Sequence, residues 1–281
     1  MIPVRTLRMA AALLVAGAAV ACQGDSSEEP RLGFTPRGFQ EQARAEARFA
    51  RGISADYISD VPLAITQRPH PAGSEGTREV VAFLRDELQR LGLEVEVPEY
   101  RAYLSAPIRT EAELLSPVRE TFALMEPSDP RDPDSSHPEI EPAYIAYSAS
   151  GEVTAPVVYV NYGLPPDYEA LRAAGVDVRG RIVIARYGRS HRAVKVYTAQ
   201  ENGAVGVIFY SDPADDGFKR GEVWPEGMWR TEFMVQRGNA KFSWFWHGDP
   251  LPPGVASTPE TPFVPPEEAP TLPRIPVVAM S

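Results

Sequence analysis

Two short apolar runs with a helical segment between them constrain the fold of this chain more than any other feature. Residues 181–187 and 205–210 are rich in β-branched side chains and are bounded by Gly, Pro or Asp, which is typical of buried strands. Residues 192–201 contain neither Gly nor Pro and end at Asn202-Gly203, a pair suited to a left-handed helix stop. The sequence therefore predicts a strand, a helix and a second strand, in that order.

A charged residue interrupts the first of these strands. Arg186 lies near the end of a run that otherwise looks fully buried. A guanidinium in such a place needs a carboxylate or a ligand as its partner. From the residues alone, we expect an internal salt bridge to Asp212 or Glu201.

The first 22 residues have the composition of an export signal. Arg5 and Arg8 precede an apolar stretch over residues 9–21 that is too short to span a membrane. Cys22 follows and is the only cysteine, and Ala19-Val20-Ala21 before it resembles a bacterial lipobox, although that pattern prefers Leu where Ala19 stands. We expect lipidation of Cys22, with a plain secretory signal cleaved near Ala21 as the alternative.

Charge narrows the range of partners. The chain has 28 Lys and Arg against 38 Asp and Glu, a formal net charge of −10, which argues against nucleic acid as a partner. The export signal and Cys22 separately predict a periplasmic or cell-surface protein, anchored by lipid to a bacterial membrane.

In the rest of the chain, the pattern of apolar and Pro residues changes near residue 105. Residues 23–35 are polar and acidic and predict a tether. We then expect helices over residues 36–57 and 77–91 and a strand over 93–103, because apolar residues recur first at helical and then at alternate spacing. Beyond residue 105, short strands are expected between Pro-rich loops, at 113–115, 143–147 and 157–160.

Three motifs in this order resemble those of one family. They are Arg68-Pro-His-Pro-Ala-Gly-Ser-Glu-Gly76, Ala185-Arg-Tyr-Gly188 and Gln236-Arg-Gly-Asn239. They resemble the start of the peptidase domain and the inserted protease-associated (PA) domain of the zinc exopeptidases related to glutamate carboxypeptidase II and the transferrin receptor. The closest match covers about residues 155–281.

The resemblance implies a fold and a domain order. It implies an α/β chain with the N-terminal piece of a zinc exopeptidase domain at residues 36–104. An inserted PA domain, a mixed β-barrel or sandwich with helices, is expected at 105–281, after the signal peptide at 1–22 and the tether at 23–35. We expect the chain to be the N-terminal part of a longer enzyme.

The same resemblance implies two zinc ions as cofactors. The chain has four histidines, and none belongs to a pattern with metal-ligand spacing. They are His70, His137, His191 and His247. We expect no zinc ligands and no catalytic residues in this chain, with both ions bound by a missing C-terminal part.

Two residues are implied to bind substrate. In the family, the positions that match Arg186 and Asn239 hold a carboxylate of the substrate, for which a planar guanidinium is suited. The alternatives are the salt bridge already named for Arg186 and an ordinary Gly-Asn turn for Asn239.

A possible calcium site is the last implied feature. Gly248-Asp-Pro-Leu-Pro-Pro-Gly254 resembles a family turn that gives backbone carbonyls to a structural calcium. Here those carbonyls belong to Pro252 and Val255, and a plain Pro-rich turn is the alternative.

These expectations combine into one functional hypothesis. We expect an exported zinc exopeptidase that hydrolyses short peptides with an acidic or free C-terminal residue, in which this chain orients the substrate but is inactive by itself. Its expected partners are the peptide, the remainder of the peptidase domain, the membrane and, in the complete protein, a second copy as a homodimer. The alternative is a non-catalytic protein- or peptide-binding module, as the transferrin receptor is within the same fold group.

Overall fold

The computed structural model of the chain describes residues 33–281. It divides into two units, one that ends at Ala64 and one that runs from Ile65 to Ser281. The predicted export signal and Cys22 lie outside the described residues. The domain boundaries predicted at 36–104 and 105–281 stay predictions.

The first unit is helical. Helix α2 (Pro36–Gly52) begins after Thr35, whose side chain accepts a hydrogen bond from the Gly38 amide. The predicted helix over 36–57 was too long, because the backbone is extended at Ile53 and a new helix, α3 (Ala55–Ile65), follows. Glycine is a poor helix former and the Ser54 hydroxyl accepts from the Tyr57 amide, so the sequence stops one helix and starts the next.

The second unit opens with helix α4 (Glu75–Arg90), close to the predicted 77–91. The strand predicted over 93–103 was wrong, because these residues form no regular secondary structure. Alternating residues become a strand only when a neighbouring strand takes their hydrogen bonds, and among the described residues none does.

Mixed α/β structure fills the remainder of this unit, which confirms the predicted fold class. Its helices are α5 (Pro165–Ala173), α6 (Arg192–Glu201) and the short α7 (Pro213–Asp216), with a 3₁₀ turn at Pro133–Ser136. Its strands are β1 (Ala112–Leu114), β2 (Glu120–Phe122), β3 (Ile145–Ala146), β4 (Val157–Tyr159), β5 (Ile182–Arg186), β6 (Gly206–Tyr210), β7 (Gly238–Asn239) and β8 (Val277–Met280).

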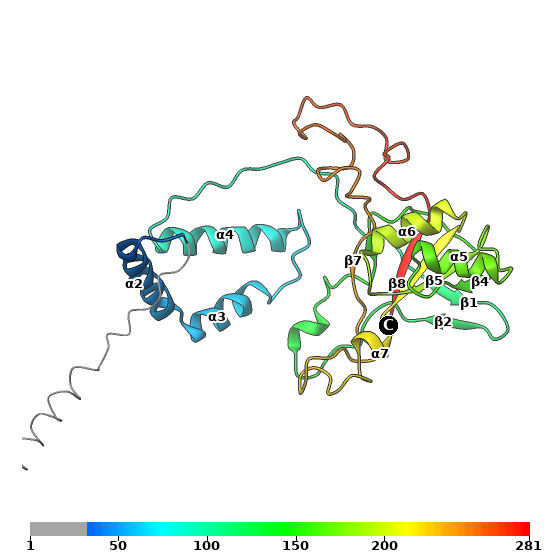
Figure 1. The fold of residues 1–281 in the computed structure, drawn as a ribbon, viewed down its shortest axis with the longest axis horizontal. Coiled ribbons are helices and arrows are strands. Elements are labelled where there is room, and N and C mark those ends of the chain that lie inside the picture. Colours follow the sequence, from blue (N-terminus) through cyan, green and yellow to red (C-terminus); the bar gives the residue numbers. More distant parts are fainter. Residues whose placement is uncertain (1–32) are drawn as a thin grey trace, which may run out of the picture. The chain divides into compact units, whose positions relative to one another are not determined.

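The strands form three sheets (Figure 1). The largest has the order β4-β5-β6-β8 and all of its pairings are parallel. A second is the parallel pair β3-β7, and the third is the antiparallel pair β1-β2. Parallel strands that follow one another need a crossover, which α5 and α6 supply between β4, β5 and β6.

The predicted strand-helix-strand unit is confirmed as β5-α6-β6. Helix α6 ends as the sequence indicated, with Gly203 at φ +81° and its neighbour Ala204 donating back to the Ala199 carbonyl. A side chain at residue 203 is excluded twice, by this left-handed backbone and by the side chain of Arg179, 2.8 Å from where a Cβ would lie.

The main core lies around the large parallel sheet. Its buried members include Val183 and Ala185 of β5 and Val207 and Phe209 of β6. The rings of Phe209 and Tyr187 stack with centroids 5.1 Å apart. Burial of alternate residues in both central strands fixes their register, since a shift of one residue would move Arg186 into the core.

Replacement of a core ring tests this packing. We expect Phe209→Ala, at a fully buried position, to lower the free energy of unfolding by about 3–5 kcal/mol because it leaves a cavity. Phe218→Ala is the matched control, because Phe218 is 45% exposed and its loss should cost well under half as much. Urea denaturation of both variants measures this, and equal losses would contradict the described core.

Candidate functional site

A groove in the second unit brings two of the sequence motifs together. It has a volume of about 810 Å³ and is lined from three stretches of chain. These are residues 69–71, residues 139–147 in part, and residues 237–239. The motif around His70 and the motif that ends at Asn239 therefore share one surface feature, although they are far apart in the sequence.

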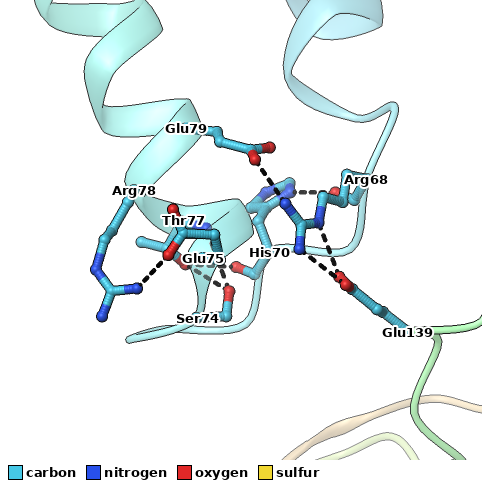
Figure 2. Close-up of polar contacts among 8 residues, drawn as sticks. All are labelled: Arg68, His70, Ser74, Glu75, Thr77, Arg78, Glu79 and Glu139. Carbon is cyan, nitrogen blue, oxygen red and sulfur yellow. Dashed lines mark hydrogen bonds and ion pairs between the residues drawn. The ribbon is translucent and has the colours of Figure 1, made fainter.

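The first wall of the groove is held by short hydrogen bonds (Figure 2). The Thr77 hydroxyl donates to the carbonyls of His70 and Pro71, at 3.0 and 2.5 Å, while its amide donates to the Ser74 hydroxyl at the start of α4. Gly76 lets the segment fold this closely, because a Cβ there would lie 2.3 Å from the Pro69 carbonyl oxygen. The Pro-His-Pro segment is thus folded back against α4.

Arg68 links this wall to the next. Its Nε and Nη2 donate to the two carboxylate oxygens of Glu139, each at 2.8 Å, and its Nη1 donates to Glu79 of α4 at 2.6 Å (Figure 2). These hydrogen bonds raise the pKa of Arg68 and lower the pKa of Glu139. The paired geometry of the fork fixes direction as well as distance, so Arg68 positions the segment before α4 against residues 139–147.

Asn239 belongs to the third wall. It ends β7, which pairs with β3 so that Gly238 lies opposite Ile145 and Asn239 opposite Ala146. The Oδ1 atom of Asn239 is buried and has no hydrogen-bond partner within residues 33–281. A buried amide oxygen without a donor is costly, and such groups mark places where a ligand or water completes the bonding.

An ion pair next to Asn239 anchors its segment. Arg237 Nη2 lies 2.6 Å from Glu126 Oε2, and Glu126 Oε1 also accepts from the Val235 amide at 3.1 Å. Burial raises the pKa of Glu126, but the hydrogen bonds from Arg237 and Val235 lower it more, so the pKa lies below its ordinary value of 4.5.

Arg186 lies elsewhere, at the carboxyl end of β5, and does not line the groove. Its Nη1 lies 3.2 Å from Asp212 and 3.4 Å from Asp215, and its Nε donates to Asn161 at 3.0 Å. The guanidinium carbon lies 4.0 Å from the centre of the Tyr162 ring.

Of the two salt-bridge partners expected for Arg186, the structure pairs it with Asp212, and within residues 33–281 Glu201 forms no ion pair with it. Its Nη2 has no hydrogen-bond partner in the described part of the chain. Asn239 and Arg186 are connected indirectly, because the hydroxyl of the next residue, Tyr187, donates to the Gln236 carbonyl at 2.7 Å. Their predicted roles in substrate binding stay predictions.

The sequence analysis missed Lys195. This side chain is 1% exposed, and its Nζ donates to the Arg186 carbonyl at 2.6 Å. The signal was present, because Lys195 shares the buried face of α6 with Val196 and Ala199, where an amphipathic helix should carry apolar residues only.

Metal binding is not supported by the described residues alone. Between residues 33 and 281, no group of three or more His, Cys, Asp or Glu side chains could hold a metal ion, so these residues do not fit a two-zinc site. At the predicted calcium turn, the Pro252 carbonyl accepts from the Val255 amide at 3.2 Å, and Asp249 accepts from the amides of Tyr103 and Leu251. Both oxygens of the Asp249 carboxylate are therefore used by backbone amides, and the calcium site stays a prediction.

Comparison with known proteins identifies the region that holds Arg186 and Asn239. The PA domain model matches residues 153–240, inside the range expected for that domain. The chain is 38% identical over 182 residues to a probable glutamate carboxypeptidase of Arthroderma benhamiae, which covers 62% of this chain and 25% of that protein. It is 32% identical over 258 residues to transferrin receptor protein 2 of Homo sapiens, which covers 92% of this chain and 30% of the receptor.

Among solved structures, an aminopeptidase from Aneurinibacillus sp. strain AM-1 is similar over 81% of this chain and 38% of its own, with 20% identity and a TM-score of 0.41. Fold and site thus define a PA-domain protein of mixed α/β structure. The chain is a homologue of the glutamate carboxypeptidases and transferrin receptors, as its motifs indicated. It spans between a quarter and a third of the length of these relatives.

The described helices were also compared with the length and hydropathy that a membrane span requires. From residue 33 onward, no helix is both long enough and apolar enough to cross a bilayer.

Acid titration tests the anchor of the Asn239 segment. Because the native pKa of Glu126 is depressed, its stabilising effect is complete above the unfolded pKa and disappears as the pH falls through the native pKa. We expect Glu126→Gln to be less stable than wild type by about 1 kcal/mol at neutral pH, since the pair is partly exposed. That difference should shrink below pH 4.5.

Urea denaturation across this pH range measures the difference. Glu120→Gln is the control, because Glu120 is exposed on β2 and has no ion pair among the described residues. A stability difference for Glu126→Gln that stays constant into the acid range would show that the Arg237 pair does not hold this segment.

Proposed function

We propose that the chain is part of a zinc-dependent exopeptidase that hydrolyses peptide bonds of short peptides, and that it supplies the residues that orient the substrate. Its homology to the glutamate carboxypeptidases supports the peptidase assignment. Arg186 and Asn239 are the proposed orienting residues. The described residues do not fit a zinc site, so the two zinc ions of the proposal are bound by residues other than these.

One observation carries the proposal. The groove is walled by two separate motifs, and the amide of Asn239 lies in its wall with a buried oxygen that has no partner among the residues that the structure describes. A polar group of a bound peptide would give that amide a hydrogen-bond partner. An amide in an exposed turn needs no such ligand, because water already satisfies it.

Arg186 contributes charge in this proposal. Two of its nitrogens are used by Asn161, Asp212 and Asp215, which hold the guanidinium over the Tyr162 ring. The third nitrogen, Nη2, remains available to a carboxylate. A guanidinium that is fixed in advance loses little side-chain entropy when it binds, which favours affinity and a defined orientation.

The second candidate function is a non-catalytic peptide- or protein-binding module. One observation favours it, because transferrin receptor protein 2 is among the relatives. Both candidates predict binding by this chain, and they differ in whether a product that includes zinc ligands cleaves the peptide.

Binding of a dipeptide that ends in glutamate tests the proposal. We expect the full 281-residue chain to bind it and Asn239→Ala to bind roughly tenfold more weakly, the loss typical of one hydrogen bond to a charged group. Arg186→Met should weaken binding at least as much. Isothermal titration calorimetry measures both effects, with Arg172→Met, remote from either residue, as the control variant.

The ligand supplies a second control. The same dipeptide with an amidated C-terminus lacks one carboxylate. Amidation should therefore reduce the affinity of wild type by a larger factor than it reduces the affinity of Arg186→Met. Equal affinity for the acid and the amide, or variants that bind like wild type, would contradict an orienting role for these residues.

Export and anchoring form a separate part of the proposal. We propose that the chain is exported to the periplasm or cell surface of a bacterium and anchored there by lipid on Cys22. The support is the charged and apolar pattern of residues 1–22 and the single cysteine at its end. Membrane, peptide and a second copy are the proposed partners.

Mass spectrometry of the protein expressed in a bacterium tests the anchor. We expect a mature chain that begins at Cys22 with a diacylglycerol adduct, and membrane-bound protein in fractionation. Cys22→Ser should remain unlipidated. A wild-type product cleaved near Ala21 without an adduct would instead establish the plain secretory signal.

A further inference from the structure

Lys195 is an unusual residue to find inside α6. It is 1% exposed, and its neighbours on the buried side of the helix are Ala193, Val196 and Ala199. No carboxylate lies within ion-pair distance of its ammonium group in the described part of the chain. Burial of a charge without a paired charge is costly, and a methionine would fill a similar volume without that cost. Packing alone therefore does not account for a lysine here.

The ammonium group of Lys195 lies close to Arg186 and to the Tyr162 ring that Arg186 contacts. Its Nζ donates to the Arg186 carbonyl at 2.6 Å and lies 5.3 Å from the centre of the Tyr162 ring. The same ring carries the Arg186 guanidinium at 4.0 Å, and its hydroxyl donates to Asp215 at 2.8 Å. Lys195 thus touches both the backbone of Arg186 and the surface on which its side chain rests.

Arg186 is the last residue of β5 and lies opposite Tyr210 of β6. Its amide donates to the Asn161 carbonyl at 2.9 Å, and its carbonyl accepts from Lys195. Both halves of the backbone at this residue are therefore fixed, one by the loop after β4 and the other by α6. Without the lysine, the carbonyl would lose its partner, and this peptide group would be held from its other side alone, where the Tyr187 amide donates to the Tyr210 carbonyl at 2.9 Å.

We propose that Lys195 is the positioning residue for Arg186: it fixes the end of β5 so that the guanidinium stays on the Tyr162 ring with Nη2 available to a substrate carboxylate. This inference rests on the proposed function, in which Arg186 binds that carboxylate. Lys195 does not itself contact the substrate.

The charged groups around Lys195 define its titration. Asp167, at the start of α5, and Asp215, on α7, favour the charged form, whereas Arg186 on β5 disfavours it. Burial is the largest effect and lowers the pKa of Lys195 from 10.5 to about 8. The group is therefore charged at neutral pH and loses its proton in mildly alkaline solution.

Only three lysines occur in the chain, at positions 195, 219 and 241, so the titration can be followed directly. In the full chain labelled with ¹³C-lysine, the Cε signal that is missing from Lys195→Met belongs to Lys195. We expect its midpoint near pH 8, and we expect the Arg186 Nε–H signal, assigned with Arg186→Met, to shift with the same midpoint.

Stability gives a second signature with a definite sign. Because the native pKa is below the unfolded one, the unfolded chain binds more protons between about pH 8 and 10.5, and stability rises with pH in that window. Lys195→Met should lack this rise and be at least as stable as wild type at neutral pH. If Lys195→Met is much less stable than wild type, although it buries one charge fewer, Lys195 has a packing role instead.

Affinity for the glutamate-terminated dipeptide distinguishes positioning from packing. We expect Lys195→Met to bind roughly tenfold more weakly, and wild-type affinity to fall above pH 8 while that of the variant stays flat. Lys219→Met is the matched control, because Lys219 is exposed and should leave affinity unchanged. If Lys195→Met does not fold, the coupled shift of Lys195 and Arg186 signals in wild type still decides the question.

The outcomes separate this inference from the proposed function. Suppose that Arg186→Met loses affinity but Lys195→Met does not, and that the Arg186 Nε–H signal does not shift as the lysine titrates. The positioning role is then wrong, and the proposed function stands. If wild type does not bind the dipeptide, the proposed function fails. In that case a coupled shift of the two signals still supports positioning, and independent signals overturn it.

Discussion

Parallel pairing in the β4-β5-β6-β8 sheet is the constraint on which the rest of the second unit depends. Parallel strands end at the same edge, so the residues that follow them meet there whatever their separation in the sequence. Asn161 follows β4, Arg186 ends β5 and Asp212 follows β6, and the three side chains are in direct contact. A polar cluster at this edge is therefore a consequence of the topology, and only the identity of its members is a matter of sequence.

The groove has a different origin, because no single element builds it. Its walls are joined by contacts between distant stretches, such as Arg68 with Glu139 at a separation of 71 residues and Arg237 with Glu126 at 111. The short pairing of β3 with β7 adds the third connection. Each ion pair is partly exposed and contributes modestly to stability, so these contacts define the shape of the groove more than they hold the fold together.

Local signals in the sequence predicted the elements whose stability is local. The unit β5-α6-β6 and its stop at Gly203 followed from apolar runs and one Asn-Gly pair, and α4 followed from helical spacing. The strand expected over 93–103 failed because pairing depends on a partner that periodicity does not reveal. Asp212 was one of the two partners predicted for Arg186, whereas Asp215 and Tyr162 required the fold. Lys195 was missed because a lysine in a helix is usually exposed, and only its buried neighbours contradict that expectation.

The central claim is that the groove between the Pro-His-Pro segment and Asn239 receives the peptide. A crystal structure of the full chain soaked with the glutamate-terminated dipeptide tests it most directly. We expect electron density for the peptide in the groove, with a polar group of the peptide hydrogen-bonded to the Asn239 amide. Peptide bound away from residues 69–71 and 237–239, with the amide still without a partner or occupied by water alone, would contradict it.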